Sequence, residues 1–192
     1  MTEQHLGRIV RLQIQGSIMK ISGVGYDPSP LLQVSEAAIG PQGITGVLER
    51  RHVMDVHHAA HPLGRGGGNR ILSIGFTGHY ELMVERFREV PVGIGGENVI
   101  VEHDGRLFED DLAGAIVILA GGGEIELTGA RVAAPCREFT SFLLQRKRVA
   151  DRREIADELM FLSSGMRGFL LDGRALAEPT PVRLGDEVVL RG

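Results

Sequence analysis

The only cysteine of the chain stands in the stretch RVAAPCREF, residues 131–139. Pro135 fixes the backbone just before Cys136 and removes a hydrogen-bond donor, so the approach to the sulfur is expected to be rigid. A position after a strand and near the start of a helix favours a thiolate, and Arg131 and Arg137 would stabilise it further if they lie close in space. Such a thiolate could be a soft metal ligand, a persulfide carrier or a nucleophile. The alternative is a buried cysteine that packs as a small hydrophobic residue.

A second set of candidates lies in HHAAHPLGRGGGNR, residues 57–70. On a helix, His57 and His61 would share one face and could ligate a metal, but Pro62 and the glycines after it disfavour a helix. Successive glycines let backbone N–H groups approach an anion, and the arginines of the run can bind phosphate. The candidates for binding an anionic ligand are therefore Arg65, Gly67, Asn69 and Arg70. The alternative is a surface loop without a ligand.

A third glycine-rich stretch is VPVGIGGENVIVE, residues 90–102. Its glycines precede a strand and do not open a helix, which excludes a dinucleotide-binding fingerprint. Gly96, Glu97 and Asn98 stand at the turn before that strand. They either bind a ligand or close the turn, and the residues alone leave both possibilities open.

The elements expected to position these residues are mostly strands. Alternating or wholly apolar patterns predict them at several places, and the glycines at 121–123 predict a hairpin between two of them. Residues 22–46 are rich in glycine, proline and serine, which predicts loops with one or two short strands. The predicted strands are residues 9–15, 70–75, 98–102, 115–120, 124–130, 168–173 and 186–192.

Helices are fewer. Thr77 is a predicted N-cap for an amphipathic helix that runs to Phe87, and residues 137–148 form a second candidate. Asp151 and Glu154 have capping-box spacing at the start of a third helix, residues 151–162. Strands outnumber helices without regular alternation, which predicts a mainly β fold with helical excursions. We expect an antiparallel or mixed β-barrel and not a doubly wound sheet.

Composition narrows the class of protein. The 192 residues predict a single domain, and a formal net charge of -4 argues against general affinity for nucleic acid. The basic run at 146–153 has no interleaved aromatic residues, so it indicates a solvated helix start. Apolar runs are too short for a membrane span and no signal peptide is evident. A lone cysteine is compatible with a reducing cytoplasm.

The order of these motifs resembles the MOSC family, named after the C-terminal domain of molybdenum cofactor sulfurases. The resemblance covers residues 6–145 and is carried by the histidine–glycine loop, the turn Gly96-Glu97-Asn98 and the pair Pro135-Cys136. Two departures are visible. Where the family often reads His-His-Gly-Gly, this chain has His57-His58-Ala59-Ala60. Where many members have Gly-Asp before a histidine, this chain has Gly46-Val47.

The resemblance implies a barrel like that of the pyruvate kinase β-barrel domain and a functional Cys136. In relatives that reduce amidoximes, the corresponding cysteine ligates molybdenum in a pterin cofactor, while other relatives are thought to carry sulfur to metal centres. If the roles of the family's residues apply to this chain, Cys136 would be the thiolate, and Glu97 and Asn98 would lie in the pocket. Arg131 would lie on the strand that leads to the cysteine. The chain lacks the ferredoxin-like or aminotransferase-like modules of some relatives. A separate electron or sulfur donor protein and a small-molecule substrate are therefore expected, without nucleic acid or membrane.

Overall fold

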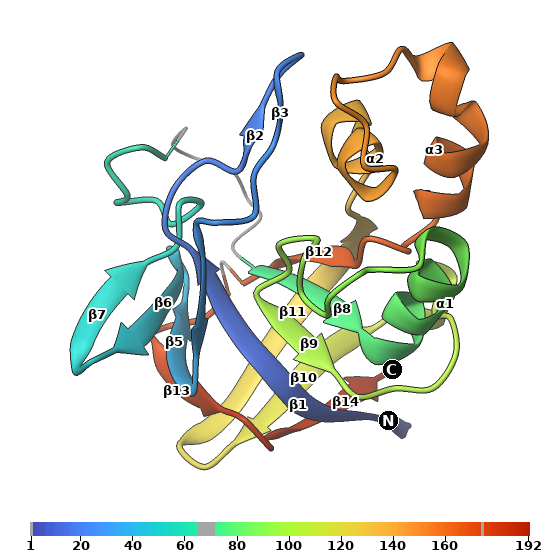
Figure 1. The fold of residues 1–192 in the computed structure, drawn as a ribbon. Helices are drawn as coiled ribbons and strands as arrows, with labels where there is room; N and C mark the ends of the chain where they lie inside the picture. Colours follow the sequence, from blue (N-terminus) through green and yellow to red (C-terminus); the bar gives the residue numbers. More distant parts are fainter. Residues whose placement is uncertain (1, 65–71, 174) are drawn as a thin grey trace.

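A closed barrel of seven strands forms the body of the protein. The computed structural model describes residues 2–64, 72–173 and 175–192 (Figure 1). Within them the barrel order is β14-β10-β11-β12-β8-β9-β1, and β1 pairs with β14 to close it. Only β8 and β9 run parallel among these pairs, so the barrel is mixed and the predicted mainly β fold is confirmed. The bounds are β1 (Glu3–Gln15), β8 (Leu72–Phe76), β9 (Val99–Val101), β10 (Ala115–Ala120), β11 (Gly123–Val132), β12 (Phe169–Asp172) and β14 (Glu187–Arg191).

The first and last strands of the chain, β1 and β14, pair with each other in this barrel. Strand β10 pairs with β11 on one side and β14 on the other, which explains why its side chains are apolar throughout. The predicted hairpin at 121–123 is present, with Ala120 opposite Gly123. Strand β1 bends at a bulge beside Gly7, where a Cβ atom would lie 1.8 Å from the carbonyl oxygen of Glu102. Glycine at position 7 therefore lets the long strand reach β14 and β9 in turn.

A smaller sheet flanks the barrel, in the order β13-β5-β6-β7, and β4 adds to the edge of β1. Much of it lies in residues 22–46, where loops with one or two short strands were predicted, so that prediction underestimated the strand content. The reason is that β5 pairs with β13 from the far end of the chain, and no local pattern reports such a partner. The strands outside the barrel are β2 (Lys20–Ile21), β3 (Gly25–Tyr26), β4 (Leu31–Val34), β5 (Glu36–Gly40), β6 (Gly43–Leu48), β7 (Arg51–Met54) and β13 (Thr180–Arg183).

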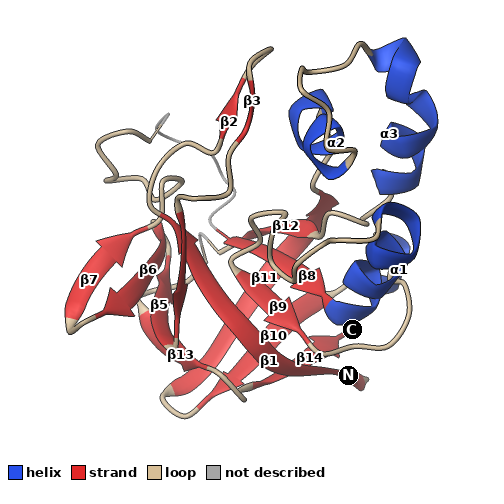
Figure 2. Cartoon of the chain, viewed as in Figure 1, coloured by secondary structure: helices blue, strands red, loops and turns tan. Residues whose placement is uncertain are grey.

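Three short helices gather on one side of the barrel (Figure 2). Thr77 is the first helical residue and not the N-cap, and its hydroxyl exchanges hydrogen bonds with the backbone of His103. The capping box of Asp151 and Glu154 is present, but it opens a 3₁₀ turn, η2 (Arg152–Ile155), before the α-helix begins. The second helix is shorter than predicted. The α-helices are α1 (Thr77–Phe87), α2 (Arg137–Leu143) and α3 (Ala156–Leu162), and a further 3₁₀ turn is η1 (Asp110–Leu112).

The helices share a second hydrophobic core beside the barrel core. Tyr80 and Met83 of α1, Phe139 of α2 and Leu162 of α3 are buried in it, and Cys136 packs partly against it. The loops that join this core to the barrel supply the walls of the site described below. No helix in the described part of the chain is long and apolar enough to cross a membrane.

Candidate functional site

A cavity of about 510 Å³ lies between the β2–β3 hairpin, the start of α2 and the end of the barrel. Its volume falls within the range of roughly 300–1,000 Å³ that is usual for small-molecule and cofactor sites. The walls come from segments far apart in the sequence. The lining residues are Gln15, Ile18, Met19, Lys20, Ser22, Tyr26, Val56, His57, Leu63, Ser73, Gly95, Gly96, Glu97, Ala133, Ala134, Cys136, Arg167 and Leu170.

Cys136 lines this cavity as the N-cap residue of α2. The half-buried sulfur accepts a hydrogen bond from the N–H group of Phe139, at 3.5 Å. The backbone turns into the helix here because Pro135 stands just before the cap, and the hydroxyl of Thr140 donates to the carbonyl of Cys136 at 2.9 Å. A guanidinium nitrogen of Arg167 lies 3.9 Å from the sulfur. The thiol is thus held at a cavity wall with two donors directed at it.

Arg167 is a site residue that the sequence interpretation missed. Its Nη2 donates to the carbonyl of Gly95 at 2.9 Å and its Nη1 to that of Ala134 at 3.4 Å. The guanidinium also lies over the ring of Phe139, 4.3 Å from the centroid. One side chain therefore joins the glycine turn before β9, the segment before Cys136 and helix α2. No motif marks it in the sequence.

Glu97 also lines the cavity, although it is only 2% exposed. The hydroxyl of Tyr80 donates to its Oε2 at 2.5 Å, and the N–H group of Gly95 donates to that hydroxyl in turn. Its Oε1 has no hydrogen-bond partner among the described residues. Burial raises the pKa of Glu97, against the opposing effect of the Tyr80 hydrogen bond. The cavity thus contains a carboxyl group that resists ionisation.

Replacing Glu97 by glutamine should make the protein progressively more stable than wild type as the pH rises above the usual carboxyl range. A raised pKa in the folded state means that the unfolded chain ionises first, so the wild type loses stability over that interval and the variant does not. Glutamine keeps an oxygen that can accept the Tyr80 hydrogen bond. Urea unfolding at a series of pH values measures the difference, with the exposed Glu102→Gln as control. A stability difference that is independent of pH would contradict this, because it would show that folding leaves the pKa of Glu97 unshifted.

Asn98 does not line the cavity, but its side chain hydrogen-bonds to the segments directly behind the cavity wall. Its Oδ1 accepts hydrogen bonds from the backbone N–H and the hydroxyl of Ser73, at 3.1 and 2.9 Å. Its Nδ2 donates to the carboxylate of Asp55 at 2.9 Å and to the carbonyl of Gln13 at 3.3 Å. The Glu-Asn pair therefore has two roles, with Glu97 facing the cavity and Asn98 joining β1, β8 and β9 behind it.

Asp55 and His57 form a second feature that the sequence interpretation missed. Asp55 is 1% exposed and accepts hydrogen bonds from the N–H of Gln15 (2.7 Å), from Asn98 and from both the N–H and Nδ1 of His57 (2.9 Å each). Although burial opposes ionisation, the hydrogen bond to His57 and the others lower the pKa of Asp55. The same hydrogen bond raises the pKa of His57, which lines the cavity.

Of the remaining predicted residues, Gly96 lines the cavity and the two arginines do not. Gly96 lines the cavity with φ of +92°, and a Cβ atom there would lie 2.5 Å from Cε of Met19. Arg131 is exposed on β11, opposite Leu170, and does not belong to the cavity lining. Arg137 lies 3.5 Å from Asp151 and not beside the sulfur.

The histidine–glycine stretch is only partly described. His57 and His61 lie in turns, so the helix that would have paired them for a metal is not formed. Within the described residues, no group of three or more histidine, cysteine or carboxylate side chains could hold a metal ion. The predicted anion-binding residues Arg65, Gly67, Asn69 and Arg70 lie outside the described residues. Leu63 and Ser73, which flank that segment, both line the cavity.

The closed mixed barrel with helices on one side is a MOSC-type fold, as the resemblance implied. Among solved structures, the chain is similar to the YUAD protein of Bacillus subtilis, with 17% identity, a TM-score of 0.51 and coverage of 98% of this chain and 95% of that one. It is also similar to YiiM of Escherichia coli, with 17% identity, a TM-score of 0.51 and coverage of 96% and 70%. No family model matches the sequence, and no curated protein matches it. At this identity the likeness concerns the fold alone.

Proposed function

We propose that this protein binds a pterin-bound molybdenum through Cys136 and reduces N-hydroxylated small molecules. One observation carries the proposal: the sole thiol lies in the wall of a cofactor-sized cavity with hydrogen-bond donors directed at its sulfur. A soft thiolate is the protein ligand that suits molybdenum in a sulfur-rich site.

The residues of the cavity fit such a cofactor. The described chain offers a single thiol and no group of three or more histidine, cysteine or carboxylate side chains that could ligate a metal, so a metal held here must bring most of its own ligands, as a metal inside an organic cofactor does. Two buried polar atoms at the cavity residues, Oε1 of Glu97 and Nε of Arg167, have no described partner. A polar ligand would satisfy atoms that are otherwise costly to bury.

Each of the main cavity residues would have its own role in binding the cofactor. When bound, the cofactor would supply the transfer of an oxygen atom coupled to two electrons. Cys136 would hold it, Arg167 would keep the sulfur and the Gly95 turn in place, and Glu97 would offer a protonated carboxyl group to the ligand. The glycine–arginine stretch with Arg65 and Arg70 remains the predicted site for the phosphate of the cofactor. Electrons would come from a separate donor protein.

A second candidate function is sulfur carriage, because Cys136 is the only thiol of the chain and is half-exposed at the cavity wall. In that case Cys136 would carry a persulfide. An attacking thiolate would take the outer sulfur, the S–S bond would break, and the Cys136 thiolate would be released. A third possibility is a non-enzymatic module that binds a small anion and has a structural cysteine.

Elemental analysis of protein purified from a host that makes the cofactor tests these alternatives. Cys136→Ser is expected to lose at least about tenfold of the bound molybdenum, since serine can still cap α2 but is a poor soft ligand. Arg137→Gln is the matched control, because Arg137 faces Asp151. Persulfide on Cys136 by intact mass, without metal, would favour the carrier. Unchanged metal, sulfur and ligand content in Cys136→Ser would make the thiol structural.

A further inference from the structure

The rim of the cavity carries exposed apolar side chains from two segments that are distant in the sequence. Three of them lie in or just before the β2–β3 hairpin and one in the loop after β7. Two of these, Ile18 and Leu63, also line the cavity, so apolar surface runs from the cavity out to the hairpin. The exposed fractions are 44% for Ile18, 58% for Ile21, 71% for Val24 and 55% for Leu63. Apolar groups gathered around one opening are typical of an interaction surface.

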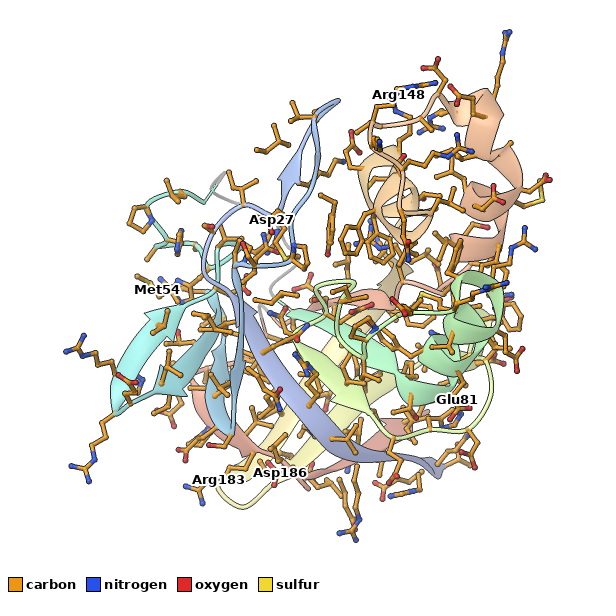
Figure 3. All side chains as sticks on the ribbon, in the orientation of Figure 1. Asp27, Met54, Glu81, Arg148, Arg183 and Asp186 are labelled. Atoms are coloured by element: carbon orange, nitrogen blue, oxygen red, sulfur yellow. The ribbon has the colours of Figure 1, made fainter. Side chains whose placement is uncertain are left out.

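A basic segment, residues 146–153, borders the tip of this hairpin. Val24 and Gly25 share a small hollow of about 110 Å³ with Arg146, Lys147 and Arg148. The hairpin and this segment project from the same end of the molecule, where Arg148 is labelled in Figure 3.

The positive charge of this segment is only partly neutralised. Arg146 and Arg148 both contact the single carboxylate of Glu154, at 3.4 and 3.1 Å. Lys147, Arg152 and Arg153 add three more exposed cations. Because the whole chain has a net charge of -4, this concentration of positive charge is a local feature of the rim.

We propose that this rim, made of Ile18, Ile21, Val24, Leu63 and the basic segment 146–153, docks an acidic electron-carrier protein with an apolar centre. The choice of partner rests on the proposed reductase function, which needs an electron donor at this cavity. Charge complementarity favours an acidic surface against the basic segment, and it would steer the encounter of the two proteins. The apolar tip and its charged border suit the small, transient interfaces of electron-transfer pairs.

A second copy of the chain fits the same rim less well. In a symmetric dimer through the hairpin tip, the two-fold axis would bring each basic segment close to the other, and like charges would repel. A membrane surface is the other occupant to be tested, since an apolar tip with basic neighbours is also found in membrane-binding segments.

The test uses the full chain without cofactor and an acidic [2Fe–2S] ferredoxin as the probe, with binding measured by calorimetry at low and high salt. We expect measurable binding at low salt that weakens as salt rises. Ile21→Ser/Val24→Ser should raise the Kd by about tenfold. Lys147→Glu/Arg152→Glu should raise it similarly at low salt and flatten its salt dependence. The controls are Leu184→Ser, an exposed apolar residue between β13 and β14, and Arg51→Glu on β7.

Four outcomes would overturn the proposal. They are no ferredoxin binding at low salt, equal effects of rim and control variants, a dimer in solution that Ile21→Ser/Val24→Ser dissociates, and binding to anionic vesicles that depends on the rim. The binding assay needs no metal, so its result does not depend on the molybdenum content of the protein. If ferredoxin binds at the rim but the purified protein holds no molybdenum, the proposed function is rejected and the docking surface is retained. If the protein holds molybdenum but ferredoxin does not bind, only the docking surface is rejected.

Discussion

Asp55→Ala is expected to destabilise the protein by about 3 kcal/mol, because it leaves several buried donors without an acceptor. The N–H of Gln15 and the amide of Asn98 both donate to this carboxylate, and neither has access to solvent at that point. Loss of the carboxylate would also free the ring of His57 and loosen the hydrogen bonds of Asn98 behind the cavity. Urea unfolding near neutral pH measures the effect.

The pH dependence gives this prediction a further check. The pKa of Asp55 is lowered in the folded protein, so its contribution is present above the usual carboxyl range and is lost as the pH falls through the folded-state value. The gap between wild type and Asp55→Ala should therefore narrow in acid. His57→Ala is the control, since the His57 ring is largely exposed and its removal should cost less than about 1 kcal/mol. Equal destabilisation by the two variants would contradict the account of Asp55.

Arg167→Met is expected to empty the site while costing about 2 kcal/mol of stability. Methionine can fill the space over Phe139, but it cannot donate to the carbonyls of Gly95 and Ala134. The turn before β9 and the segment before Cys136 would then separate, and we expect at least about a tenfold loss of bound molybdenum.

Arg167→Lys separates charge from geometry. A lysine keeps the positive charge near the sulfur, but its single ammonium group cannot reproduce the fork that joins the two walls. We therefore expect it to restore little of the bound metal. Full metal content in Arg167→Lys would show that charge alone matters, and full content in Arg167→Met would remove Arg167 from the site.

Local patterns in the sequence predicted what depends on local physics. The hairpin at 121–123 follows from glycine at a tight turn between two apolar strands. The position of Cys136 between a strand and a helix follows from proline and the change in periodicity. The presence of Glu97 at the cavity came from the family resemblance, and local chemistry alone had left it undecided between a turn and a ligand site.

The features that the sequence did not predict depend on contacts between distant segments. Arg167 is 31 residues from Cys136 and 72 from Gly95, and only the closed barrel brings the three together. Asp55 becomes a buried acceptor because β1 and the turn before β9 fold over it. Arg131 was expected on the strand that leads to Cys136, as a residue of the cofactor site, but the bulge between Thr128 and Arg131 and the pairing with β12 leave it exposed and outside the cavity lining. An isolated charged residue gives no local signal for any of these outcomes.

Glu97 at the cavity wall and Asp55 behind it, which holds the cavity-lining His57, are two buried carboxyl groups of opposite character. Burial keeps the first carboxyl protonated over a wider pH range, while hydrogen bonds keep the second ionised. This separation is the usual way in which one site holds both a hydrogen-bond donor and a fixed negative charge.

The most direct test of the central claim is molybdenum X-ray absorption on the purified holoprotein, which counts the sulfur atoms bound to the metal. We expect one sulfur more around the metal in wild type than in any molybdenum retained by Cys136→Ser, with Arg137→Gln identical to wild type. Molybdenum bound with the same sulfur count in wild type and Cys136→Ser would contradict it, because the thiol of Cys136 would then not be a ligand.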